Sequence, residues 1–129
     1  MKAGRLLAAA GLAVVMLCSC AAAEYHKITA EEAKEILDEG GDNTVLLDVR
    51  TEEEFQENRI EGAVLLPDNE IGERALDELP DKNARILVYC RSGVRSKKAA
   101  NELVEMGYKR VYDFGGILDW PYETVNSEN

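Results

Sequence analysis

From residue 24 onward, short apolar runs typical of buried strands alternate with segments that have the apolar spacing of helices. Four short apolar runs, at residues 45–49, 63–66, 85–89 and 111–114, predict buried strands. The run Arg-Ile-Leu-Val-Tyr at 85–89 is the clearest of the four, and the run at 45–49 is interrupted only by Asp48. The segments between these runs have the apolar spacing of helices.

Start signals, stop signals and apolar faces mark the helical segments. Residues 29–32 and 51–54 both have the sequence Thr-x-x-Glu, the capping-box pattern that begins a helix. Gly40 and Gly107 stand where helices would end. Three of the segments carry apolar residues at helical spacing: Ala33, Ile36 and Leu37; Ile71, Ala75, Leu76 and Leu79; Ala99, Ala100, Leu103 and Met106.

Strands that alternate with helices predict βαβ units. We therefore expect an α/β fold with a mostly parallel central sheet of about five strands and helices on both faces. A length of 129 residues suggests a single domain. We place this domain at residues 25–125, followed by a polar tail at 126–129 that we expect to be frayed.

The N-terminal segment has the pattern of a secretory signal and is set apart from the fold. Lys2 and Arg5 precede an apolar run of 12 residues, 6–17, and small residues follow it. A membrane-spanning helix needs about 20 apolar residues, so this run is too short to be a permanent anchor. We expect residues 1–19 to be removed and 20–24 to form a short tether.

The end of this signal resembles the lipobox of bacterial lipoproteins. In Leu17-Cys18-Ser19-Cys20 an aliphatic residue, a tolerant position and a small residue precede Cys20, which would be the acylated residue. Acyl chains on Cys20 would hold the exported protein at a membrane, outside the cytoplasm. The alternative is ordinary cleavage after Ala23, which would release a secreted or periplasmic soluble protein.

The charge balance argues against nucleic acid as a partner. The full chain carries 15 Lys and Arg against 25 Asp and Glu, a net charge of −10. Removing residues 1–19 takes away Lys2 and Arg5 and no acidic residue, which leaves −12. Such a surface repels phosphate backbones.

Cys90 is the one cysteine that the processed domain would keep as a thiol. It ends the strongest predicted strand, and Arg91, Ser92, Gly93, Val94 and Arg95 follow as a turn before a helix. Ligands of open parallel sheets bind beyond the carboxyl ends of the strands. A loop that enters a helix there points its N–H groups at one place, which favours the thiolate and makes it nucleophilic.

The charges near Cys90 favour an anionic ligand. Four of the eight residues from 91 to 98 are basic. Arg91 and Arg95 lie in the turn and can present forked donors to an oxyanion. We interpret Lys97 and Lys98 as the solvated face of the helix. With His26 as the one histidine, no spacing of metal ligands is present, and we expect neither a metal nor another cofactor.

The segment from Val88 to Ser96 resembles the active-site loop of rhodanese domains. Three further segments match the family in order: Leu-Leu-Asp-Val-Arg at 46–50, Arg-Ile-Glu-Gly-Ala at 59–63, and a closing segment with Gly115, Gly116 and Trp120. Together they span residues 25–123 of this chain. One departure is Arg59, where the family usually has histidine.

The resemblance implies a double-displacement sulfur transfer, and we expect the protein to be a monomer. Cys90 would take sulfur from a small anionic donor such as thiosulfate, hold it as a persulfide and pass it to cyanide or a thiol. Residues 91–95 would bind the donor and stabilise the persulfide. Asp48 and Arg50 also match the family, and we interpret them as structural support, because buried charges are normally paired.

Three alternatives remain from the sequence. A related phosphatase or arsenate reductase would have Cys-x5-Arg, whereas the spacing from Cys90 to Arg95 is Cys-x4-Arg and closes a smaller loop. A catalytically silent rhodanese-like binding module would typically lack the cysteine. A thiol redox protein would need a second, resolving cysteine nearby, and no Cys-x-x-Cys pair occurs at Cys90.

The lipobox makes a prediction about the mature N-terminus. We expect the processed protein to begin at an acylated Cys20 and to partition with membranes, which mass spectrometry of the N-terminal peptide and fractionation would show. A soluble protein that begins at Glu24 would contradict it.

Overall fold

The computed structural model describes residues 24–41 and 43–128. The predicted signal peptide, the acylation of Cys20 and most of the tether lie outside these residues and stay predictions. Within the described residues no helix is long and apolar enough to cross a membrane.

The sheet has five strands, all parallel, in the order β1-β5-β4-β2-β3. The predicted α/β fold with a parallel sheet is therefore confirmed. The strands are β1 (His26–Lys27), β2 (Thr44–Asp48), β3 (Val64–Leu65), β4 (Arg85–Cys90) and β5 (Arg110–Gly116). The apolar runs predicted four of them. They missed β1, because two exposed residues leave no apolar pattern.

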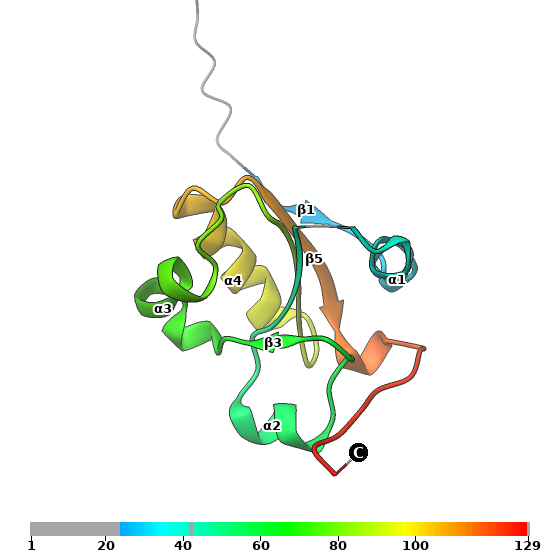
Figure 1. Ribbon diagram of the computed structural model, residues 1–129. Helices are drawn as coiled ribbons and strands as arrows, with labels where there is room; N and C mark the ends of the chain where they lie inside the picture. The colour runs from blue at the N-terminus through cyan, green and yellow to red at the C-terminus, as the bar shows by residue number, and fades with distance from the viewer. Residues whose placement is uncertain (1–23, 42, 129) are drawn as a thin grey trace, which may run out of the picture.

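Helices cover both faces of the sheet, as Figure 1 shows. On one face lies α1 (Ala30–Glu39), and on the other lie α3 (Ile71–Glu78) and α4 (Val94–Glu105). Two single turns, η1 (Asp68–Glu70) and η2 (Ile117–Asp119), precede α3 and follow β5. The remaining helix, α2 (Glu52–Glu57), lies at the carboxyl end of the sheet and has no buried residue.

The side chains of β4 alternate between two apolar cores. Ile86, Val88 and Cys90 pack with α3 and α4 on one face, whereas Leu87 and Tyr89 pack with α1 and the C-terminal segment on the other. This two-sided burial explains why the strand has a continuous apolar sequence. It also places Cys90 at the carboxyl end of a central strand.

The helix starts follow the predicted caps with one difference. At α2 the Thr51 hydroxyl accepts the Glu54 N–H and the Glu54 side chain accepts the Thr51 N–H, which completes a capping box. At α1 the Thr29 hydroxyl accepts the N–H of Glu32 at 3.1 Å, without the return bond seen at α2. Both threonines still satisfy an N–H group that the first helical turn would leave without a partner.

Candidate functional site

Cys90 lies at the junction of β4 and α4, with its side chain fully buried. The backbone N–H of Gly93 donates a hydrogen bond to its Sγ atom at 3.0 Å. Only residues 91–93 separate the strand from α4, so the predicted turn is shorter than expected and Val94 and Arg95 belong to the helix. The sulfur thus faces an N–H group at the N-terminal end of a helix of 12 residues, where the dipole favours negative charge.

The conformation of this loop depends on glycine. Gly93 has φ +102°, a backbone conformation that residues with a Cβ rarely adopt. This conformation directs the Gly93 N–H back toward the sulfur and lets α4 begin at the next residue. The Ser96 hydroxyl, fully buried, donates to the Gly93 carbonyl at 3.2 Å and fixes the same peptide from the helix side.

The end of β5 packs against the backbone of the loop that follows Cys90. Cys90 pairs with Gly116 across the β4–β5 ladder. A Cβ on Gly116 would lie 2.0 Å from the carbonyl oxygen of Arg91, so no other residue fits there without a shift of backbone. The N–H of Leu118 donates to that same carbonyl at 3.2 Å. Sequence reasoning did not assign Gly116 this role, and the Gly-Gly pair directly after an apolar strand was its signal.

The two arginines of the loop region differ in their partners. Arg91 is exposed, and no ion pair involves it within the described residues. Arg95 forms a bidentate ion pair with Glu54 of α2, with distances of 2.7 and 2.9 Å. The hydrogen bond from Arg95 lowers the pKa of the Glu54 carboxyl to about 2. The sequence predicted that Arg95 binds the donor anion, whereas the structure gives its guanidinium an acidic partner.

Asp48 and Arg50 form a buried ion pair at the carboxyl end of β2. Arg50 Nη2 lies 2.7 Å from Asp48 Oδ2 and donates to the carbonyl of Asn58 at 2.6 Å. The guanidinium stacks 5.6 Å from the centre of the Tyr89 ring. These contacts connect β2, β4 and the segment after α2. Because each charge of the pair neutralises the other, neither is free to bind a ligand at the loop that holds Cys90.

Other residues considered from the sequence have exposed side chains. Lys97 and Lys98 are exposed on α4, and Val94 is 75% exposed. His26 stacks on Tyr112 at the edge of the sheet, and β5 separates its strand from β4. No cluster of three or more metal-ligating side chains occurs among residues 24–41 and 43–128.

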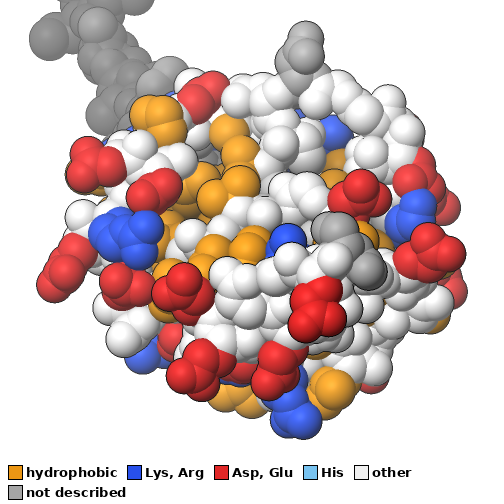
Figure 2. All heavy atoms as spheres, turned by 60° about the horizontal axis from the view of Figure 1, so that its bottom comes forward, with side chains coloured by type: hydrophobic (Ala, Val, Ile, Leu, Met, Phe, Trp, Pro, Cys, Tyr) orange, Lys and Arg blue, Asp and Glu red, His pale blue; other side chains and the backbone are white. Residues whose placement is uncertain are grey.

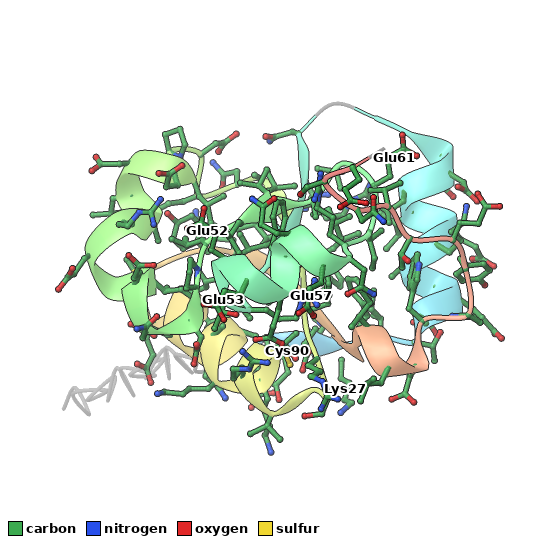
Figure 3. The ribbon with its side chains drawn as sticks, turned by 90° about the horizontal axis from the view of Figure 1, so that it is seen from below. Lys27, Glu52, Glu53, Glu57, Glu61 and Cys90 are labelled. Atoms are coloured by element: carbon green, nitrogen blue, oxygen red, sulfur yellow. The ribbon has the colours of Figure 1, made fainter. Side chains whose placement is uncertain are left out.

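Acidic side chains of α2 lie at the end of the molecule that holds Cys90. Figure 3, seen from below, shows Glu52, Glu53 and Glu57 on α2 at the same end as Cys90. The face that includes this end carries many acidic and few basic side chains in Figure 2. Negative charge therefore predominates on the face that includes this end.

The family model for the rhodanese-like domain matches residues 29–122. The chain belongs to the rhodanese-like domain family. Its relatives include the thiosulfate sulfurtransferase PspE of Escherichia coli, 41% identical over 57% of this chain and 70% of the relative. Thiosulfate sulfurtransferase GlpE of Coxiella burnetii is 35% identical over 74% of this chain and 87% of the relative.

Other comparisons show the range of proteins that carry this domain. A solved structure described as rhodanese with anions from E. coli is similar with a TM-score of 0.61 and 37% identity, over 65% of this chain and 99% of that one. The tRNA uridine(34) hydroxylase of Yersinia pestis is 30% identical over 74% of this chain but only 28% of its own length. The resemblance seen in the sequence is therefore confirmed at the level of the family and its sulfurtransferase relatives.

The close approach of Gly116 to the Arg91 carbonyl predicts that Gly116→Ala destabilises the domain and opens the loop that holds Cys90. The added methyl group would displace the Arg91 carbonyl, and overpacking of this kind costs about 1–3 kcal/mol of unfolding free energy. We expect urea unfolding to show the loss and thiol labelling of Cys90 to become faster as the loop opens. Gly72→Ala is the matched control, because its methyl group would meet only the flexible end of the Glu102 side chain. Equal effects of the two changes would contradict the role of Gly116.

Proposed function

We propose that this rhodanese-like domain is a sulfurtransferase that carries sulfur as a persulfide on Cys90. The hydrogen bond from the Gly93 N–H to Cys90 Sγ is the observation that supports this most directly. A backbone donor at a helix N-terminus stabilises an anionic sulfur without a side-chain base. The names of the relatives PspE and GlpE agree with sulfur transfer from thiosulfate.

The proposed reaction has two displacements. The Cys90 thiolate attacks the outer sulfur of thiosulfate, the S–S bond of the donor breaks, and sulfite leaves with the electron pair. In the second step cyanide or a thiolate attacks the outer sulfur of the Cys90 persulfide. Thiocyanate or a new persulfide leaves, and the Cys90 thiolate is restored. The exposed Arg91 is the cation available to bind the donor.

The geometry disfavours the phosphatase alternative. Such an enzyme needs the arginine of its cysteine loop to hold a phosphate group. Here Arg95 is paired with Glu54, and the loop between strand and helix consists of only residues 91–93.

We further propose that the domain acts outside the cytoplasm and is tethered to a membrane through Cys20. The lipobox pattern in the sequence supports this proposal.

Cys90→Ser tests the proposed chemistry. A serine hydroxyl has nearly the same shape but forms no persulfide, so thiocyanate production from thiosulfate and cyanide should fall to background. Intact mass after incubation with thiosulfate should show a gain of one sulfur atom on the wild type only, while circular dichroism stays unchanged. Undiminished transfer by the serine variant would refute the mechanism, and wild-type aryl phosphate hydrolysis without sulfur transfer would favour a phosphatase.

Arg91→Ala tests donor binding. Hydrogen bonds to charged groups are worth about 1.5–3 kcal/mol, so we expect KM for thiosulfate to rise roughly tenfold or more. Lys98→Ala removes the same charge from the exposed face of α4 and should have little effect. If both variants behaved alike, only general electrostatics would remain and the specific role of Arg91 would be wrong.

A further inference from the structure

The ion pair between Glu54 and Arg95 joins two elements that are far apart in the sequence. Glu54 belongs to α2 and Arg95 to the first turn of α4, 41 positions later. Both side chains are partly buried, with 24% and 30% of their surfaces exposed. Arg95 is the second residue of α4, two positions after Gly93. Because the pair is partly buried, solvent screens its charges less than it would at an open surface.

The capping box holds the Glu54 carboxylate in position. Its Oε1 atom accepts hydrogen bonds from the Thr51 hydroxyl at 3.1 Å and from the Thr51 N–H at 3.3 Å, in addition to the bond from Arg95. Because both oxygens of Glu54 face the guanidinium, the charge of Arg95 is neutralised by a carboxylate that is itself fixed. A carboxylate held in this way competes with any anionic donor for Arg95.

The ion pair neutralises one of the four basic residues at positions 91–98, and it is one of the two arginines. Of the two arginines at this loop, only Arg91 has no acidic partner within the described residues. Glu52, Glu53 and Glu57 add negative charge at the same end of the molecule (Figure 3). A dianion such as thiosulfate meets repulsion there that a zwitterionic donor, with its ammonium group, does not.

We propose that Glu54 determines the charge selectivity of the sulfur site by occupying Arg95, so that the site prefers sulfur donors with little net negative charge, especially those that carry an ammonium group. This inference rests on the proposed sulfur transfer at Cys90. Glu54 acts through Arg95 and does not touch the donor. The reaction is unchanged: the Cys90 thiolate attacks the outer sulfur, the S–S bond breaks, and the remainder of the donor leaves with the electron pair.

A series of three donors that differ in charge tests this selectivity. Thiosulfate carries two negative charges, methanethiosulfonate one, and 2-aminoethanethiosulfonate a net charge of zero. All three present an outer sulfur, and they release sulfite, methanesulfinate and 2-aminoethanesulfinate respectively. The rate kcat/KM is measured for each donor with cyanide as the acceptor, at low ionic strength, on wild type and Glu54→Gln.

Glu54→Gln should free Arg95 for the donor. We expect kcat/KM to rise about tenfold for thiosulfate, by a smaller factor for methanethiosulfonate and hardly at all for 2-aminoethanethiosulfonate, because a charge-assisted hydrogen bond to Arg95 becomes available. The gain should appear in KM more than in kcat. Glutamine keeps the capping box, and α2 buries no residue, so the fold should persist. Glu54→Ala, which loses the cap, should show the same order of donors.

Glu57→Gln is the matched control, because it removes one charge from the same helix without breaking the ion pair of Arg95 with Glu54. It should change the ratio between donors by less than about twofold. The double variant Glu54→Gln/Arg95→Gln should lose the gain for thiosulfate. If Glu54→Gln and Glu57→Gln shifted the ratio equally, or if the gain survived without Arg95, the inference would be overturned while the proposed function stood. If the wild type took up no sulfur from any donor, both would be overturned.

Discussion

The hydrogen bond from the Gly93 N–H to the Cys90 sulfur requires a strand to become a helix within three residues. That sharp change of direction is possible because Gly93 adopts a positive φ and because the end of β5 passes directly beneath the Arg91 carbonyl. The loop is thus shaped by backbone contacts, with Gly116 as the point of closest approach. The side chain of Arg91 therefore stays exposed while the sulfur of Cys90 is buried.

The sheet makes this geometry rigid. Cys90 continues a central strand that is hydrogen-bonded on both sides, and its side chain belongs to the apolar core under α3 and α4. The buried pair of Asp48 and Arg50 braces the neighbouring strand end. Removing one member of a buried ion pair typically costs about 3–5 kcal/mol, because the other charge is left without a partner. The position of Cys90 is therefore fixed by the sheet, the core and the ion pair beside it.

Groups that favour negative charge and groups that oppose it lie at the same end of the molecule. The dipole of α4 and the Gly93 N–H favour an anionic sulfur, whereas α2 brings acidic side chains to the same end of the molecule. The Gly93 N–H points at the sulfur itself, whereas the acidic side chains lie on α2, which has no buried residue. In the proposed reaction, this separation would let the site stabilise a thiolate or persulfide and still discriminate among donors by their charge.

The local sequence was enough to predict the strands β2 to β5, the helices and the position of Cys90. These features depend on neighbours in the chain: apolar runs, capping residues and a cysteine between a strand and a helix. The length of the loop was less certain, because nothing in the sequence separates a turn of residues 91–95 from one that ends at Gly93. The short edge strand β1 was missed, since its two exposed residues pair only because β5 lies beside them.

Only the tertiary structure decided which groups meet around the sulfur. Arg95 looked like a free anion ligand in the sequence, and it became the partner of Glu54 because the order of strands brings α2 beside α4. The place of Gly116 under Arg91 has the same origin, since it follows from the pairing of β4 with β5. Local sequence determines which elements form, but contacts between residues far apart depend on how the crossovers stack those elements, and that packing decided the charge around Cys90.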